Sequence, residues 1–364
     1  MAITKAPFGR ADDRDVDLYT LTNANGLVMN VMTYGAIVTR LDLPDSKGRL
    51  ADVVLGFDDL EGYLGKSPYF GAVVGRLANR VRDGRFELEG KSYKVATNDG
   101  PHHLHGGEKG WDKVVWDAEA ADTPDGPAVR LRYVSRDGEE GYPGTVTATC
   151  VYTLTKDNVL RVEMQATSDK VTLVNMAHHT YWNLGGEGSG PVTDEELTLR
   201  AGSYTPGDEL VPGRVPGRVP GRVPGRVPTG RVEPVRGTPF DFTLPKPIGA
   251  DLKAAGGDPT GYDHNFVVDG SPGELRPVAR LADRRTGRVL SLEADRPGVQ
   301  FYSGNFLDGS ITGKGGKAYT KHAGLCLETQ AFPNAINVPA WRNQVVLHPG
   351  QTYRHVMIHR FTTE

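Results

Sequence analysis

The chain has 364 residues, and 42 Lys and Arg against 45 Asp and Glu give it a net charge of −3. This balance excludes a basic field over the whole protein, so nucleic acid and anionic membrane surfaces are poor candidate partners. No apolar run approaches the roughly 20 residues that a membrane-spanning helix needs. The 46 glycines and 25 prolines favour many turns over long helices, so we expect a soluble, turn-rich globular protein.

Two features bear on the compartment. Residues 1–10 contain no apolar segment of the kind found in a signal peptide, so we expect a cytoplasmic protein, or a secreted or periplasmic one if a signal peptide has been removed. Cys150 and Cys326 are too few for a disulfide framework. Both lie in apolar, strand-like runs, and we interpret them as buried free thiols. We expect a monomer or a weak dimer.

Apolar and polar residues alternate in several stretches along the chain. The stretches lie at 129–133, 146–154 and 160–167, and turn signals separate them at 136–138, 156–158 and 283–287. Only 58–64 suggests a short helix. Many strands without alternating helices predict an all-β fold, a large antiparallel β-sandwich or barrel. No change in composition marks a boundary, so we expect one domain over 1–364.

A low-complexity segment interrupts this pattern, because Val-Pro-Gly-Arg occurs four times in succession at 211–226. Pro-Gly suits the centre of a type II turn. We interpret the segment as a tandem expansion of 16 residues in a solvent loop, since loops tolerate insertion at little cost. The alternative is a basic arm whose four arginines bind an acidic partner.

Polar side chains gather at five places. These places are 79–80, 101–107, 178–183, 263–265 and Glu328. Alternation puts Glu328 on one strand face with Cys326 and Gln330, opposite the face of Leu325 and Leu327. A carboxylate on an apolar strand is either a buried group with a function or the solvent side of a half-buried strand, and the sequence favours neither.

The histidines allow several interpretations. His178 and His179 are adjacent in a strand-like run, so they point to opposite faces and at most one of them enters a given pocket. Histidines at 102, 103 and 105 suggest a metal site, but no Cys pair or His-Glu-x-x-His helix supports one. The following Gly106-Gly107 indicates a close approach of the backbone to a packing partner or a ligand.

Seven ordered segments resemble the aldose 1-epimerase (galactose mutarotase) family. The segments are 79–81, 104–107, 179–184, 238–242, 263–266, 297–302 and 328–333. Any one of them is unremarkable, but together they are specific and fall in order along nearly the whole chain. The chain departs from the family at His178 and His103, where the family usually has Asn, and in the repeat at 211–226.

This resemblance implies a single large β-sandwich with an open sugar-binding cleft. It implies interconversion of the α- and β-anomers of aldohexoses such as D-glucose and D-galactose, with no cofactor or metal. The family's general base falls on Glu328 and its general acid on His179. Its remaining sugar contacts fall on Asn79, Arg80, His105, Asp263 and Gln300.

The chemistry explains why such residue types are needed. Ring opening removes the proton of the C1 hydroxyl while the ring oxygen is protonated, so a base and an acid act on two oxygens of one carbon. A glutamate with a reference pKa near 4.3 is ionised at pH 7. A histidine with a reference pKa of about 6.5 benefits from a nearby carboxylate if it is to be the acid.

Three other functions fit part of the pattern. A retaining glycosidase would use Asp263 and Glu328 as its carboxylate pair. A carbohydrate-binding sandwich would explain the polar contacts without catalysis, and a sugar-phosphate epimerase would need more basic residues than Arg76 and Arg80. For stacking on the sugar, the candidates are Trp111 and Trp182, of which Trp182 is better assigned to the core.

Overall fold

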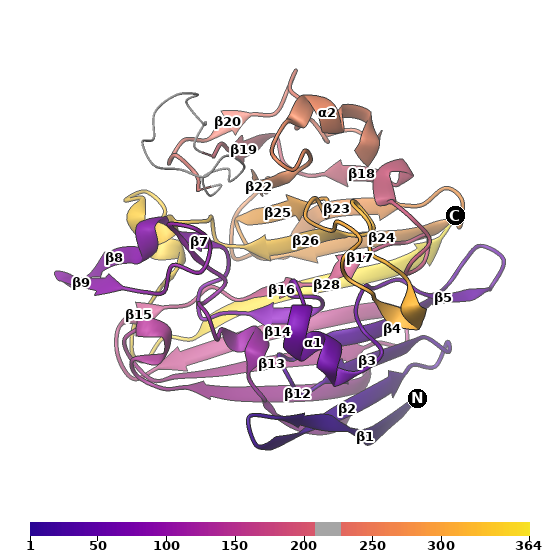
Figure 1. Ribbon diagram of the computed structural model, residues 1–364, viewed down its shortest axis with the longest axis horizontal. Helices are drawn as coiled ribbons and strands as arrows, with labels where there is room; N and C mark the ends of the chain where they lie inside the picture. The colour runs from indigo at the N-terminus through magenta and orange to yellow at the C-terminus, as the bar shows by residue number, and fades with distance from the viewer. Residues whose placement is uncertain (208–226) are drawn as a thin grey trace.

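The computed structural model describes residues 1–207 and 227–364, so the repeat at 211–226 lies outside the described residues. Within them the largest sheet has nine strands in antiparallel order (Figure 1). In spatial order they are β11 (Asp117–Thr123), β12 (Gly126–Ser135), β13 (Val146–Leu154), β14 (Val159–Ser168), β28 (Tyr353–Thr363), β24 (Arg288–Ala294), β23 (Arg276–Ala282), β18 (Glu196–Leu199) and β21 (Lys246–Pro247).

Two smaller sheets complete the main framework among the described residues. The first runs β1 (Ala2–Ala11), β2 (Arg14–Thr22), β3 (Val28–Met32), β4 (Val38–Pro44) and β5 (Leu50–Asp52). The second runs β17 (Tyr181–Trp182), β26 (Leu325–Gln330), β25 (Gly298–Tyr302), β22 (Asp263–Val267), β19 (Ser203–Thr205) and β20 (Glu233–Pro234). The all-β, antiparallel class predicted from the alternation is therefore confirmed.

Four short two-stranded ladders complete the sheets of the described residues. They pair β7 (Arg80–Val81) with β10 (His103–Leu104), β6 (Ala72–Val74) with β16 (Ala177–His179), β15 (Thr172–Leu173) with β27 (Val346–Leu347), and β8 (Arg85–Leu88) with β9 (Lys91–Lys94). The helices are short, α1 (Leu60–Lys66) and α2 (Leu252–Ala255). The Asp59 side chain caps α1 by accepting the Gly62 N–H, so the helix expected at 58–64 begins slightly later.

Alternation along the strands decides which side chains form the core. In β14, Leu160, Val162 and Met164 are fully buried, whereas the intervening Arg161 and Glu163 are partly exposed. One cluster of buried apolar residues joins all three main sheets, with members such as Met29 of β3, Leu292 of β24 and Leu325 of β26. No helix in the described ranges is long and apolar enough to cross a membrane.

Strand β26 breaks the half-buried pattern, because all six of its residues are buried. It pairs with β17 on one edge and with β25 on the other. Its two faces are covered by different groups. Leu325 and Leu327 belong to the core that joins the sheets. The opposite face carries Cys326, Glu328 and Gln330 away from that core, and this face is where the polar residues of distant segments meet.

Candidate active site

Glu328 lies near the middle of β26, opposite Gln300 of β25, and only 2% of its surface is exposed. The sequence left open whether this carboxylate is buried or on the surface, and the structure shows that it is buried. Its Oε2 atom is inaccessible and has no hydrogen-bond partner among the described residues. A buried carboxylate oxygen without a partner is costly. Asp112 Oδ1 and Glu195 Oε2 share this state among the described residues, so what distinguishes Glu328 is the cluster of polar side chains from distant segments that surrounds it.

His179 ends β16 and places its Nε2 atom 3.6 Å from Glu328 Oε1. On the other side of the ring, Nδ1 lies 3.6 Å from the Sγ atom of Cys326. The neighbouring His178 points the other way, where it contacts Thr180 through Nε2 at 2.9 Å and packs against the rings of Tyr152 and His359. The expected division of the pair between two faces is confirmed, and His179 is the histidine beside the glutamate.

The ladder of β7 and β10 brings two distant motifs together. Leu104 pairs with Arg80, and the His105 N–H donates to the Asn79 carbonyl at 3.0 Å. In return the Asn79 N–H donates to His105 Nδ1 at 3.2 Å. Since Nδ1 accepts this bond, the neutral imidazole carries its hydrogen on Nε2 and is a donor at that atom.

Three groups come close enough to share a cation, because the ligand atoms of His105, His179 and Glu328 lie within 4.8 Å of one another. The hydrogen bond from Asn79 opposes coordination, since it leaves His105 Nε2 protonated. The cluster therefore suits the binding of hydroxyl groups better than the binding of a metal. His102 and His103 do not join it: His103 contacts Ala96 and Tyr142, and His102 accepts the N–H of Asp83.

The turn after His105 serves packing. Gly106 has a φ of +89°, and a Cβ atom there would lie 1.9 Å from the carbonyl oxygen of Gly75. A Cβ atom on Gly107 would lie 2.0 Å from the carboxylate of Glu140. Of the two alternatives for these glycines, a packing partner or a ligand, the structure shows the packing partner.

Amides and carboxylates line the site next to β26. The Gln300 side-chain amide donates to Asp263 Oδ1 at 2.7 Å, and the Gln330 amide donates to Gln300 Oε1 at 3.3 Å. The Asn79 amide donates in turn to Gln330 Oε1 at 3.4 Å. This row of hydrogen bonds links three of the expected sugar contacts through Gln330. Period-two alternation from Glu328 is the signal that pointed to Gln330.

Arg80 joins the same site with a side chain that is only 12% exposed. Its Nε atom lies 2.7 Å from Asp99 Oδ2, so part of the guanidinium is held by a salt bridge. Arg76 is different. Its guanidinium is buried on Ser135 and on the carbonyls of Pro143 and Gly144, which removes it from any phosphate-binding role.

Burial governs the protonation of the central pair. It raises the pKa of Glu328 well above its ordinary value, and the negative charge of Asp263 raises it further. Burial lowers the pKa of His179 to about 4 and that of His105 well below its usual value. The environment therefore favours the uncharged forms of both groups: an imidazole that stays neutral down to about pH 4, and a carboxyl that keeps its proton to a higher pH than usual.

Aromatic residues at the site differ from the expectation. Trp111 and Trp182 are each 1% exposed, so the assignment of Trp182 to the core is confirmed and neither ring is available for stacking on a sugar. Tyr69 instead contacts both imidazoles, with ring centres 4.7 Å from His105 and 5.5 Å from His179. Nothing in the local sequence marked Tyr69, because its position depends on a turn conformation.

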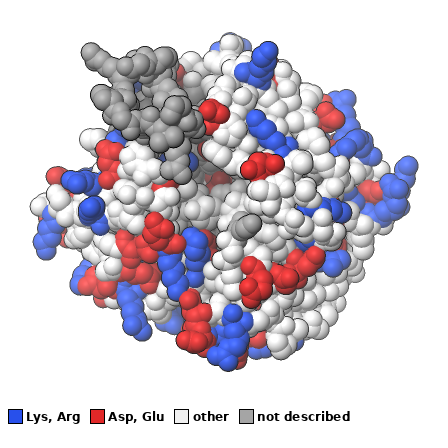
Figure 2. Space-filling view, viewed as in Figure 1, with Lys and Arg blue, Asp and Glu red and all other residues white. Residues whose placement is uncertain are grey.

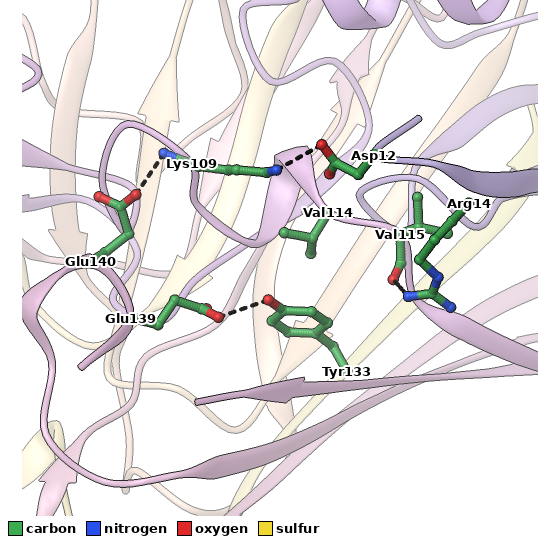
Figure 3. Close-up of a pocket in the computed structure, with 8 residues that line it drawn as sticks. All are labelled: Asp12, Arg14, Lys109, Val114, Val115, Tyr133, Glu139 and Glu140. Atoms are coloured by element: carbon green, nitrogen blue, oxygen red, sulfur yellow. Dashed lines mark hydrogen bonds and ion pairs between the residues drawn. The ribbon is translucent and has the colours of Figure 1, made fainter. Parts of the chain in front are cut away.

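A separate pocket lies between β12 and the loops that carry Asp12, Lys109 and Glu139 (Figure 3). Its polar groups are already paired within the protein. Lys109 Nζ lies 2.7 Å from Asp12 Oδ1, and the Tyr133 hydroxyl donates to Glu139 at 2.8 Å. On the face seen in Figure 2, acidic and basic side chains intermingle. These pairings leave Lys109 and Tyr133 engaged within the protein.

Comparison with known proteins places the chain in one enzyme family. The family model described as aldose 1-epimerase matches residues 17–220 and 223–360. The chain is 42% identical to galactose mutarotase of Bos taurus, covering 100% of this chain and 99% of the relative. It is 32% identical to aldose 1-epimerase of Escherichia coli (strain K12), with 100% of both chains covered.

Solved structures with the same fold are also found. A GalM/aldose epimerase homologue from C. elegans superposes with a TM-score of 0.82 at 28% identity, covering 95% of this chain and 98% of the other. A galactose 1-epimerase from Lactobacillus acidophilus NCFM gives a TM-score of 0.82 at 27% identity, covering 100% and 99%.

Proposed function

This chain belongs to the aldose 1-epimerase family, and from that premise we propose that it interconverts the α- and β-anomers of aldohexoses such as D-galactose and D-glucose. It is an isomerase that acts on carbohydrates. We assign the general base to Glu328 and the general acid to His179. Arg80, Asn79, His105, Asp263 and Gln300 are assigned to binding of the sugar.

One observation carries the assignment of the catalytic pair. Glu328 and His179 come from different sheets, yet their reactive atoms lie 3.6 Å apart in a buried cluster, and Glu328 Oε2 has no partner among the described residues. An acid and a base this close can reach the two oxygens that share the anomeric carbon. A site built only to bind a sugar would not need a buried carboxyl with one unpartnered oxygen and a raised pKa.

The proton transfers balance over the cycle. For ring opening the pair must carry its proton on His179 and leave Glu328 ionised, so binding of the sugar has to shift the proton from the carboxyl to the imidazole. Glu328 then removes the proton from the C1 hydroxyl while His179 delivers one to the ring oxygen, and the bond between C1 and the ring oxygen breaks. The sugar is now an open aldehyde, and rotation about C1–C2 presents its other face. On closure the former ring oxygen attacks C1, His179 takes back its proton, and Glu328 returns one to the new C1 hydroxyl.

The surrounding groups offer complementary hydrogen bonds for sugar hydroxyls. His105 donates from Nε2, Arg80 donates from its guanidinium, and the carboxylate of Asp263 accepts. The row of amides that ends in Gln300 fixes the orientation of Asp263. Preorganised donors and acceptors of this kind hold a substrate without a conformational cost at the moment of reaction.

Polarimetry tests the function directly. Freshly dissolved α-D-glucose or α-D-galactose is followed with and without the protein, and the uncatalysed rate is subtracted. We expect a faster approach to the same final rotation. Absence of acceleration from folded protein would favour a carbohydrate-binding sandwich, and release of phenol from an aryl glycoside would instead favour a glycosidase.

Two substitutions test the assigned roles. We expect Glu328→Gln and His179→Asn each to lower kcat by about 10²–10⁴-fold, the range usual for a general acid or base, while the fold persists. The matched control is Glu195→Gln. Glu195 is another buried glutamate with a raised pKa, to about 8, but it binds the backbone of Leu184 and Gly185. It should retain full activity, and near-normal rates in both test variants would remove the pair from the mechanism.

We further propose a cytoplasmic location and a monomeric or weakly dimeric state. Support for the location comes from Cys150 and Cys326, which are both buried and free. Light scattering at micromolar concentration, with and without galactose, measures the mass, and cell fractionation measures the location.

A further inference from the structure

Tyr69 has an unusual backbone conformation for its residue type. It lies in the turn that precedes β6, with a φ of +68°. An aromatic residue in the left-handed region is uncommon, because its Cβ atom crowds the following carbonyl. Strained positions of this kind persist where the surroundings fix them, and they are concentrated at functional sites.

The turn is tied to the strand that carries His179. The Gly71 N–H donates to the His179 carbonyl at 3.0 Å, and the Tyr181 hydroxyl donates to the Pro68 carbonyl at 3.1 Å. The Tyr69 ring is thereby held at a fixed place relative to the imidazole. Its plane is inclined by 32° to the ring of His179 and by 57° to that of His105.

Tyr69 differs from its neighbours in exposure. Tyr181 also contacts His179, but it is 3% exposed and its hydroxyl is engaged by Pro68. Tyr69 is half-buried, and its hydroxyl makes no hydrogen bond within residues 1–207 and 227–364. The Lys113 ammonium lies 5.5 Å from the ring centre. A partly accessible ring with an unengaged hydroxyl, placed over both imidazoles, is suited to contact a ligand.

We propose that Tyr69 is a substrate-contacting residue, whose ring packs against the C–H face of the pyranose and whose hydroxyl binds one of the sugar's hydroxyl groups. This inference rests on the proposed function. A pyranose has an apolar C–H face, and an aromatic side chain supplies apolar area at a small cost in conformational entropy. Trp111 and Trp182 are too deeply buried to provide it.

The ring position also agrees with the sugar contacts already assigned. Tyr69 contacts His105, an assigned sugar-binding residue, and His179, the assigned acid, so a sugar bound between them would lie within reach of the ring. Arg80, another assigned contact, follows Asn79, whose N–H donates to His105 Nδ1 at 3.2 Å.

Two variants separate the two parts of the proposal. Tyr69→Phe keeps the ring and removes the hydroxyl, and we expect KM for galactose to rise about 3–10-fold with kcat within about twofold. Tyr69→Leu removes the ring, and we expect KM to rise at least about 10-fold with a fall in kcat, because both imidazoles lose a packing partner. The control is Tyr93→Leu. Tyr93 is a half-buried tyrosine of β9 that lies outside the site and stacks on Phe86 of the neighbouring β8.

The outcomes distinguish contact from packing. A purely structural role lowers the melting temperature and the active fraction but leaves KM unchanged, as we expect for Tyr93→Leu. An unchanged KM in Tyr69→Phe overturns the contact by the hydroxyl, and an unchanged KM in folded Tyr69→Leu overturns the contact by the ring. If the wild-type protein does not accelerate mutarotation at all, the proposed function fails instead.

Discussion

Burial of Glu328 and His179 reverses the usual order of their pKa values, and this has a measurable effect. An exposed pair would hold one proton only between about pH 4.3 and 6.5. Here the pair takes up a second proton only as pH falls through the pKa of His179, about 4, and loses its single proton only above the raised pKa of Glu328. The window in which the pair holds one proton therefore opens near pH 4 and ends at the raised pKa of Glu328.

We predict that kcat/KM for galactose falls as pH drops through about 4, the pKa of His179, and stays nearly constant above this until the raised pKa of Glu328 is reached. Initial rates by polarimetry, with the spontaneous rate subtracted at each pH, measure this profile. A decline that begins as pH rises through 6.5 would show that an ordinary histidine controls the reaction, and would contradict the assignment. Glu195→Gln, which lies outside the site, should reproduce the wild-type profile.

For single residues, the sequence predicted which strand face a side chain takes, but not whether that side chain is buried. Alternation separated His178 from His179 correctly, because adjacent residues of a strand always point to opposite faces. The burial of Glu328 was not predictable, since it depends on β17 and β25 lying on either side of β26. Tyr69 was missed because a turn of 67–71 with a left-handed residue leaves no pattern in composition.

The turn that carries His105 depends on a glycine for which no substitute fits. Gly106→Ala would combine a positive φ with a Cβ atom 1.9 Å from a backbone oxygen. We expect a loss of about 3–5 kcal/mol in stability. We also expect a fall in kcat/KM, because His105 must shift with the loop. Thermal unfolding and polarimetry measure both.

Gly100→Ala is the control for this substitution. Gly100 also has a positive φ, +61°, but no atom lies within 4 Å of the place that a Cβ atom would take there. It should lose only the about 1–2 kcal/mol that a left-handed alanine costs, with activity unchanged. Equal losses of stability in the two variants would mean that the contact with the Gly75 carbonyl does not prevent a side chain at position 106.

The connection that contains the Val-Pro-Gly-Arg repeat begins and ends at paired residues. Gly207 forms an antiparallel bridge with Pro228, and the Thr229 N–H donates to the Pro206 carbonyl at 2.9 Å. Removal of 211–226 would leave four residues between the bridged pair, a common length for such a loop. Because loop length changes the closure entropy only slowly, the pairing should survive.

We therefore predict that deletion of 211–226 changes the melting temperature by less than about 3 °C and leaves kcat/KM within about twofold of wild type. Differential scanning calorimetry and polarimetry measure the two values. Loss of activity with an unchanged melting temperature would instead support a role for the four arginines.

Whole strands were predictable where one side faces the core and the other faces solvent. The alternation at 146–154 and 160–167 corresponds to β13 and β14, each with a buried and a more exposed face. The pairing of strands was not predictable. Ladders such as β7 with β10 join segments whose turns and spacing contain no signal for one another, so the meeting of Asn79 with His105 was implied only by family resemblance.

At the scale of the molecule, one apolar cluster joins the three main sheets, and three buried histidines lie close to it. Burial lowers the pKa values of His178 and His355 well below the usual range and that of His359 to about 4. All three are neutral in the folded state at pH 5, whereas in the unfolded chain they bind protons below about pH 6.5. These three histidines therefore reduce stability as pH falls from 6.5 toward 4, whereas Glu195 and Glu328, whose pKa values are raised by burial, act in the opposite sense.

We predict a single cooperative unfolding transition whose midpoint falls as pH is lowered from 7 to 5. Each histidine contributes up to about 1.4 kcal/mol per pH unit. His178→Asn, which restores the residue usual in the family, should make this fall smaller. Two separate transitions would show that the chain folds as more than one unit, and an unchanged slope in His178→Asn would show that His178 does not contribute.

The position of β28 affects how the protein is made. This strand fills the middle of the nine-stranded sheet, between β14 and β24 (Figure 1). A ribosome synthesises β14 and β24 long before 353–363 leaves the exit tunnel, so the nascent chain exposes two unpaired strand edges throughout that interval. Folding of the largest sheet must then wait until 353–363 has been synthesised, and the two unpaired edges are where a chaperone would be needed in the meantime.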